Sequence, residues 1–246
     1  MEDLTQRQVD ILRTIIKEYS ETGVAVGSEI LETKYKLGVS PATIRNEMVE
    51  LAKKSYLKKT HFSSGRVPSA KGFRFYIKHL MKQKDLSTTD EVAYKNSIWD
   101  ERAESHRLLS QAVKVLSQRT GLLSLVTTND GDLYYSGMAN LLTQPEFLDL
   151  NLSRSLFSRL DEVNFWERIL DEFVGVEDEI KCMLGEEDFH DATFDACASV
   201  WGEFEGKKIK GMIGVVGSKR MYYDLIIPQI KYFSNLIETI AKEQNL

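Results

Sequence analysis

The stretch Val39-Ser40-Pro41-Ala42-Thr43-Ile44-Arg45-Asn46-Glu47-Met48 (residues 39–48) predicts the start of a helix. Ser40 is a preferred N-cap residue, and Pro41 then takes the first helical position, where its missing N–H costs nothing. Apolar side chains recur at helical spacing and predict a buried face made of Ile44, Met48 and Leu51. The outward face is then expected to hold Ala42, Thr43, Arg45, Asn46, Val49 and Lys53.

Two further helices are predicted before this one. Thr5 and Gln8 have the spacing of a capping box, and the apolar residues that follow predict a helix over about 5–21. A short helix is expected over about 28–36, with Gly38 as its left-handed C-cap. A short helix, a tight glycine-containing turn and a second helix with small, hydrogen-bonding residues at its exposed start are typical of a helix-turn-helix.

The residues after the third helix predict a β-hairpin. Residues 56–62 alternate in polarity like a strand, residues 63–65 form a turn, and Arg66-Val67-Pro68 begins a return strand that proline keeps at an edge. This hairpin would be the wing of a winged helix, and Ser69 caps a fourth helix after it. That helix is expected to pack Phe73, Tyr76, Ile77 and Leu80 and to expose Lys71, Arg74, Lys78 and Lys82.

Charge is distributed unevenly along the 246 residues. The net charge of −5 divides into +7 over residues 1–84 and −12 over residues 85–246. Residues 51–84 carry ten Lys and Arg and no carboxylate. A charge run is usually a solvated face, but so long a basic stretch in an acidic chain favours a polyanionic partner such as nucleic acid.

The composition excludes several protein classes. A content of 42% apolar residues and a mean hydropathy of −0.29 is ordinary for a globular chain. The apolar stretches are far shorter than the roughly 20 residues of a membrane-spanning helix. An acidic N-terminus does not fit a secretory signal, and two cysteines do not make a disulfide scaffold. We therefore expect a cytoplasmic protein without a membrane segment.

Residues 85–246 predict a separate α/β region. Residues 85–120 are expected to form a linker and one long amphipathic helix that passes through Trp99 and Leu116. Residues 121–246 are expected to form a regulatory or dimerisation domain, with a hairpin at Asp130-Gly131. Further elements are predicted as a helix over about 152–174, strands near 180–184, 194–200 and 209–216, and a closing helix over about 222–242 that Pro228 kinks or divides.

No enzyme site is predicted. The spacing of Cys182, His190 and Cys197 matches no zinc pattern, and buried cysteine is the simpler interpretation. The glycines at 211, 214 and 217 fit neither a P-loop nor a dinucleotide fingerprint, so strand packing is the preferred explanation. The acidic residues near 186–195 fit a solvated loop better than a cation site. We expect no catalytic residue, no cofactor and no metal.

Ordered stretches at both ends of the chain resemble the family of the heat-inducible transcription repressor HrcA. They are residues 4–8 (LTQRQ), 39–48 (VSPATIRNEM), 64–68 (SGRVP), 71–76 (KGFRFY), 140–147 (NLLTQPEF), 184–187 (LGEE) and 213–223 (IGVVGSKRMYY). The resemblance implies a winged helix-turn-helix over 1–84, followed by a GAF-like α/β domain over 121–246, and so an α+β fold. It also implies a homodimer that binds an inverted-repeat operator of chaperone genes and is tuned by the GroE chaperonin.

The chain departs from the family pattern in one segment. Residues 121–127 look like the first GAF-like strand, but the turn at 129–131 leads directly toward the segment at 140–147. The stretch that would hold the family's inserted dimerisation domain is therefore expected to be missing. Dimer contacts could then come from the helix around 99–116 or from the closing helix.

The predicted DNA contacts lie on the third helix and the hairpin. Arg45 can pair bidentately with guanine and Asn46 with adenine, whereas either could instead brace the wing. Ala42 and Thr43 can contact a thymine methyl, and the helix N-terminus at Ser40 can take a phosphate. Phosphate contacts are expected from Lys53, Lys58, Lys59, Arg66, Lys71 and Arg74, and minor-groove contacts from His61 and Ser63.

Two other classes of function remain open from the sequence. The α/β domain could sense a metabolite, which would make the chain a ligand-gated winged-helix regulator. Alternatively, the winged helix could be a module that binds an acidic protein or an RNA. Loss of base preference in Arg45→Ala would favour the DNA repressor over the interaction module.

Overall fold

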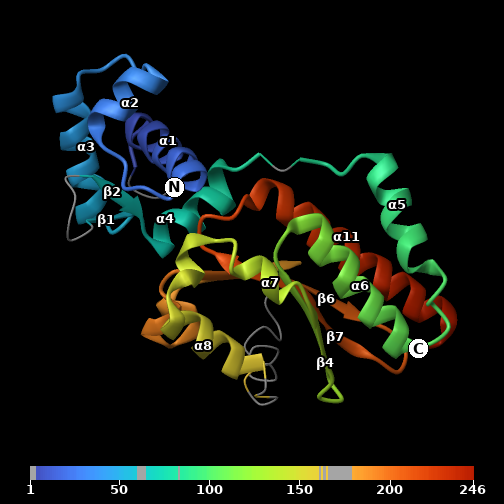
Figure 1. Ribbon diagram of the computed structural model, residues 1–246. Coiled ribbons are helices and arrows are strands. Elements are labelled where there is room, and N and C mark those ends of the chain that lie inside the picture. Colours follow the sequence, from blue (N-terminus) through green and yellow to red (C-terminus); the bar gives the residue numbers. More distant parts are fainter. Residues whose placement is uncertain (1–3, 60–64, 83, 161, 163–164, 166–178) are drawn as a thin grey trace. The chain divides into compact units, whose positions relative to one another are not determined.

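The computed structural model describes residues 4–59, 65–82, 84–160, 162, 165 and 179–246 (Figure 1). The chain divides into two compact units, one of Met1–Lys82 with Arg220–Tyr222 and the other of Gln83–Lys219 with Tyr223–Leu246. Helices and antiparallel strands occur together, so the fold is α+β, as the sequence predicted.

The first unit has helices and one hairpin. In chain order its elements are α1 (Gln6–Thr22), α2 (Ser28–Tyr35), α3 (Pro41–Lys53), β1 (Leu57–Lys59), β2 (Arg66–Pro68), α4 (Ala70–Phe75) and a π-helical turn, η1 (Tyr76–Leu80). Contacts between α1 and α3 and between α2 and α3 build its core, which includes Ile11, Leu12, Ile15, Leu31, Ile44, Leu51 and Phe73.

The predicted helix starts are confirmed. Thr5 and Gln8 form the capping box of α1. The Ser40 hydroxyl accepts a hydrogen bond of 3.2 Å from the Thr43 N–H, and the Ser69 hydroxyl accepts one of 3.0 Å from the Gly72 N–H. One helix end was predicted wrongly. The C-cap of α2 is Lys36 at φ 49°, because its N–H closes the last turn onto Glu32, whereas Gly38 is left-handed further along the turn.

The hairpin pairs β1 with β2 in antiparallel register, with Leu57 opposite Pro68 and Lys59 opposite Arg66. Arg66 also exchanges two backbone hydrogen bonds with Val26, of 2.9 and 3.0 Å. These bonds anchor β2 to the segment between α1 and α2. The rest of the predicted first strand and its turn, residues 60–64, lies outside the described residues.

The second unit is built around a five-stranded antiparallel sheet of order β4-β3-β7-β6-β5. Its strands are β3 (Leu123–Thr128), β4 (Leu133–Ser136), β5 (Ile180–Leu184), β6 (Cys197–Glu205) and β7 (Lys210–Ser218). Its helices are α5 (Thr88–Trp99), α6 (Ser105–Thr120), α7 (Met138–Leu141), η2 (Pro145–Leu148), α8 (Leu150–Leu160), α10 (Glu186–Phe189), η3 (Ala192–Phe194) and α11 (Tyr223–Gln244).

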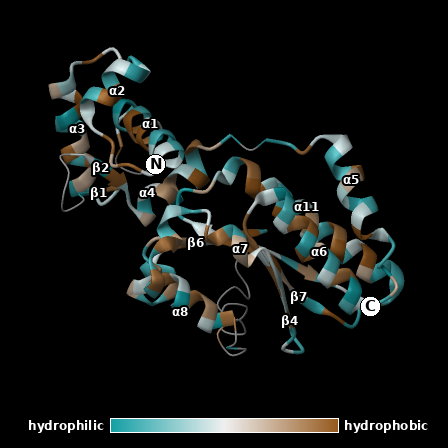
Figure 2. Ribbon diagram, viewed as in Figure 1, coloured by the Kyte–Doolittle hydropathy of each residue, from teal (hydrophilic) through white to brown (hydrophobic). Residues whose placement is uncertain are grey.

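Both faces of this sheet are buried. On one face α6 contacts β3 and β4, while α11 contacts β6 and β7. On the other face lies α8, whose ribbon includes hydrophobic residues (Figures 1 and 2). Its Leu152, Leu156 and Leu160 join the cluster of Leu123, Leu125 and Trp201. Since both faces are covered, β3, β6 and β7 are almost continuously buried rather than alternating. This arrangement is consistent with a GAF-like domain.

Several predicted elements of the second unit need correction. The single long helix is two helices, α5 and α6, because the chain turns over residues 100–104. The strand expected near 194–200 begins at Cys197, since Phe194 belongs to η3. Helix α11 runs unbroken through Pro228 rather than being divided by it. Of the helix predicted over about 152–174, α8 is the described part, and most of residues 161–178 lie outside the described residues.

Candidate nucleic-acid interface

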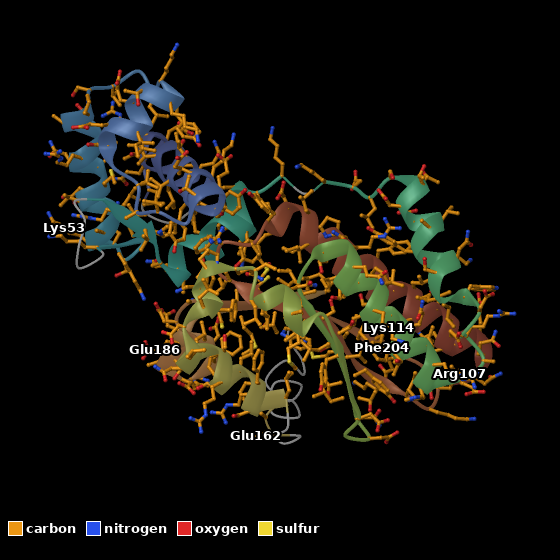
Figure 3. The ribbon with its side chains drawn as sticks, in the orientation of Figure 1. Lys53, Arg107, Lys114, Glu162, Glu186 and Phe204 are labelled. Carbon is orange, nitrogen blue, oxygen red and sulfur yellow. The ribbon has the colours of Figure 1, made fainter. Side chains whose placement is uncertain are left out.

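The side chains of helix α3 differ in how far they are exposed. Ile44, Met48 and Leu51 are buried, as the sequence predicted. Ala42 and Asn46 are exposed near the start of the helix. Lys53 is exposed at its end (Figure 3). Thr43 is half-buried, and its hydroxyl lies 3.0 Å from the Ser40 hydroxyl within the N-cap. The Ser40 side chain is therefore engaged in the cap, and a phosphate at this helix end would meet backbone N–H groups.

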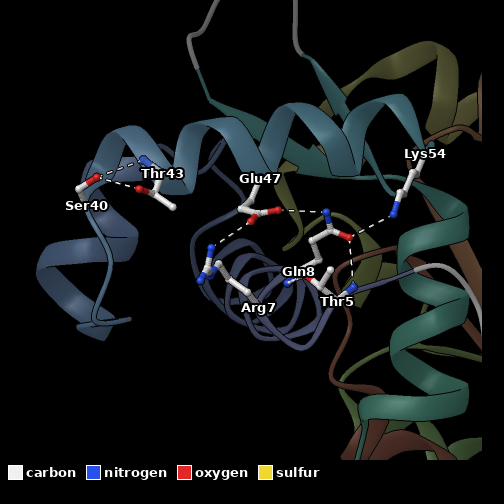
Figure 4. Close-up of polar contacts among 7 residues, drawn as sticks. All are labelled: Thr5, Arg7, Gln8, Ser40, Thr43, Glu47 and Lys54. Atoms are coloured by element: carbon white, nitrogen blue, oxygen red, sulfur yellow. Dashed lines mark hydrogen bonds and ion pairs between the residues drawn. The ribbon is translucent and has the colours of Figure 1, made fainter.

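One flank of α3 is fixed against α1 by a polar network (Figure 4). Glu47 accepts hydrogen bonds of 3.0 Å from Gln8 Nε2 and 3.4 Å from Arg7 Nη1. The side-chain oxygen of Gln8 accepts from Lys54 Nζ at 3.2 Å and from the Thr5 N–H at 3.3 Å. The sequence did not predict this network. Gln8 was the residue that indicated it, because it is a polar residue on the apolar face of a helix.

The opposite flank of α3 borders a groove of about 540 Å³. Arg45 and Val49 of α3, residues at the start of α2, and both strands of the hairpin meet here. The lining residues are Ala25, Gly27, Ser28, Glu29, Ile30, Arg45, Met48, Val49, Lys59, Gly65 and Arg66. Three predicted DNA-contacting residues, Arg45, Lys59 and Arg66, thus come together in one place.

Arg66 is the most enclosed of these three cations. It is half-buried, and its Nη1 donates a hydrogen bond of 3.3 Å to the Gly65 carbonyl. Its Nε is buried with no hydrogen-bond partner among the described residues. A buried donor of a charged group without a partner is unfavourable.

The remaining predicted contacts are dispersed over the unit. Lys53 pairs with Glu50 at 2.8 Å. Lys71 Nζ of α4 donates to the Lys54 carbonyl at 3.2 Å and lies 4.4 Å from the centre of the Tyr56 ring, so it ties the start of α4 to the segment between α3 and β1. Lys58 is exposed and Arg74 is half-buried. The other two predicted contacts, His61 and Ser63, lie outside the described residues.

A second polar cluster, which the sequence did not predict, joins α1 to α2. Glu18 is buried, and its carboxylate accepts hydrogen bonds from Lys34 at 2.5 Å and from the Tyr35 hydroxyl at 2.7 Å. The bond from Lys34 lowers the pKa of Glu18 below its usual value, although burial opposes the shift. Burial, reinforced by Glu18, raises the pKa of Tyr35. This cluster fixes the short helix α2 on α1.

The cysteines are consistent with core packing rather than chemistry. Cys197 is buried, and burial raises the pKa of its thiol far above the usual range. Within the described part of the chain, no group of three or more His, Cys, Asp or Glu residues is placed to hold a metal ion. The glycines of β7 are packing residues, since a Cβ at Gly214 would lie 2.5 Å from the Val200 carbonyl oxygen and against the Trp201 ring.

Comparison with known proteins supplies the family. The model for the HrcA protein C-terminal domain matches residues 37–227, more than half of the chain. The chain belongs to the HrcA family. It is therefore a transcription regulator, a class whose members are generally not enzymes. None of the described helices is both long enough and apolar enough to cross a bilayer.

Solved structures support the fold of this HrcA-family chain. The crystal structure of a hypothetical protein at 2.2 Å resolution matches with a TM-score of 0.81 at 18% identity. The match covers 98% of this chain and 100% of the chain in that structure. Two IclR regulators also match. The one from Alicyclobacillus acidocaldarius has a TM-score of 0.31 at 10% identity and covers 99% and 100% of the two chains. The one from Brucella abortus has a TM-score of 0.28 at 11% identity and covers 97% and 95%. TM-scores this low do not establish that these two regulators share the fold of this chain.

The HrcA-like segments of the second half meet at the end of β7. The Gln144 side chain accepts a hydrogen bond of 2.8 Å from the Ser218 N–H, and Glu146 accepts one of 2.9 Å from the Ser218 hydroxyl. Lys219 pairs with Asp195 at 3.1 Å, and Gly185 leaves room for its side chain. Segments 140–147, 184–187 and 213–223 therefore build one end of the sheet.

Proposed function

We propose that this chain is a sequence-specific DNA-binding transcription repressor whose first unit is a winged helix-turn-helix. The observation that carries the proposal is the groove beside α3, where Arg45 meets Lys59 and Arg66 of the hairpin. A helix fits the major groove of duplex DNA, and cations flanking it can neutralise phosphates. The exposed Ala42 and Asn46 then lie where base edges would be.

The DNA-binding surface comprises α3, the hairpin and α4. Its residues are Ser40, Ala42, Thr43, Arg45, Asn46, Lys53, Lys58, Lys59, His61, Ser63, Arg66, Lys71 and Arg74. Lys53 and Lys71, which have intramolecular partners, contribute less than the cations of the groove, because each must give up or share a partner to bind a phosphate.

The family assignment supports a finer proposal. Two copies of the chain bind an inverted repeat, because a two-fold dimer matches a two-fold operator. The controlled genes encode heat-shock chaperones, and the GroE chaperonin tunes activity by maintaining the folded second unit. The second unit mediates dimerisation and regulation in a cytoplasmic protein.

Binding-site selection tests this function directly. The purified chain, with its oligomeric state measured, is used to select sequences from a pool of random duplexes. We expect an inverted repeat bound far more tightly than a scrambled duplex of equal length. The logarithm of the binding constant should fall linearly with the logarithm of salt concentration, by about 0.9 per phosphate neutralised. Equal affinity for selected and scrambled duplexes would contradict the proposal and favour an interaction module.

A further inference from the structure

The side chains of α3 that were predicted to read bases point in different directions about the helix axis. An α-helix has about 3.6 residues per turn, so successive side chains are rotated by about 100°. The buried residues Ile44, Met48 and Leu51 define the inward direction. Ala42 and Asn46 lie directly opposite, on the outermost line of the helix. Arg45 lies about a quarter of a turn away from that line, on the flank beside the groove.

The charge around Arg45 suits a full negative charge. The groove brings Arg45 together with Lys59 and Arg66, against the single carboxylate of Glu29 in its lining. A base edge offers acceptors with partial charges, which one guanidinium can satisfy. Three cations that line one groove favour an anion there, and a phosphate is the anion that DNA supplies.

The groove also has an apolar part that strengthens this preference. Ile30, Met48 and Val49 line it beside the cations. Charges interact more strongly where apolar side chains displace water.

We propose that Arg45, Lys59 and Arg66 bind one backbone phosphate of the operator, and that Asn46 and Ala42 discriminate between bases. This inference rests on the proposed function. Arg45 is then a positioning residue. It sets the register of α3 on the duplex, which allows Asn46 to reach a base edge, and it carries no sequence information of its own.

The experiment compares variants on the selected operator and on duplexes that each differ from it at one base pair, over a range of salt. Arg45→Ala should weaken binding to every duplex by one common factor, and so should Lys59→Ala. Because both side chains contact one phosphate, loss of that contact should lower the salt slope by about 0.9 in total. Asn46→Ala should relax preference at one base pair by about 5- to 150-fold and leave the slope unchanged. Arg13→Ala is the matched control, because Arg13 is an exposed cation of α1 that pairs with Asp10 and lies outside the groove.

A second measurement identifies the phosphate. Neutral methylphosphonate linkages are placed at one operator position at a time. At one position the affinity loss should be smaller in Arg45→Ala than in the wild-type chain, because one of the three charges that contact this phosphate is already absent. Arg45→Lys should restore most of the affinity, since a lysine also pairs with a phosphate, whereas it would not restore bidentate pairing with guanine.

The outcomes separate the inference from the proposed function. Relaxed preference at one base pair in Arg45→Ala, with every methylphosphonate position costing that variant as much affinity as it costs the wild-type chain, would overturn the phosphate assignment and leave DNA recognition intact. A wild-type chain that shows no preference among the duplexes would overturn the proposed function itself.

Discussion

The side-chain amide of Gln8 donates a hydrogen bond of 3.0 Å to Glu47 Oε2, which ties the first turn of α1 to the middle of α3. Gln8 is buried, and its oxygen accepts from Lys54 and from the Thr5 N–H. The Gln8 side chain thus forms hydrogen bonds with groups at the start of α1 and along α3. The rotation of α3 about its own axis is fixed by this contact together with the apolar core.

Gln8→Ala should lower the free energy of unfolding by about 1–2 kcal/mol, because it removes several hydrogen bonds and leaves Glu47 with a weaker set of partners. Urea denaturation followed by circular dichroism measures the change. Arg7→Ala serves as the control, since its pair with Glu47 spans 3.4 Å and involves an exposed arginine. It should cost less than about 0.5 kcal/mol. Equal losses in the two variants would contradict this interpretation of the network.

The Glu18 cluster should make stability depend on acid pH. Because the pKa of Glu18 is lowered in the folded chain, its contribution is complete above the usual value of 4.5 and is lost as the pH falls through the folded value. Glu18→Gln should therefore destabilise the chain by about 1 kcal/mol at neutral pH and by progressively less as the pH falls below about 4.5. Denaturation of both proteins over a series of buffers from neutral to acid pH measures this difference. A difference that stays constant with pH would exclude a role for the charge.

Gly214→Ala should destabilise the second unit by about 3 kcal/mol, because the added methyl group overpacks a site where the backbone cannot move away easily. The methyl group would press on the Val200 carbonyl and the Trp201 ring in the middle of the sheet. Gly121→Ala is the control, since a Cβ there meets nothing within 4 Å and costs only the strain of φ 66°, about 1 kcal/mol. Thermal unfolding of both variants gives the comparison, and a Gly121 effect as large as that of Gly214 would refute the packing explanation.

Cys197 should resist alkylation in the folded chain. Its thiol is buried with a raised pKa, so the reactive thiolate is scarce, whereas Cys182 is half-buried. Peptide mass mapping after timed exposure to iodoacetamide should show Cys182 modified first. Cys197 should react only at the rate of unfolding. Equal rates for the two thiols without denaturant would show that the sheet opens around Cys197.

The sequence was most informative where local chemistry decides structure. The capping pair of Thr5 and Gln8, the Ser40 cap and the buried face of Ile44 predicted α1 and α3 correctly, since each depends on residues within one or two turns. It was less informative where distant contacts decide. The periodicity of residues 85–120 did not reveal the break between α5 and α6, nor that Tyr94 of α5 packs against Phe233, a residue far along the chain.

The candidate site shows the same division. Composition identified the basic stretch and the residues that could contact DNA. It could not show that Arg45 lines a groove together with Lys59 and Arg66. Nor could it show that Lys71 donates a hydrogen bond to the Lys54 carbonyl and lies over the Tyr56 ring. Those facts depend on the placement of β1 and β2 beside α3.

The pairing of β3 with β7 has a consequence for biosynthesis. Leu123 lies opposite Val216, so the ribosome must add residues 129–209 after finishing β3 before its partner on that side begins to emerge. During that interval an apolar strand has an unsatisfied edge, which is the kind of surface that aggregates in a nascent chain. The second unit is thus the part of the molecule most exposed to failure during synthesis, and its yield should respond to the supply of folding helpers in the cell.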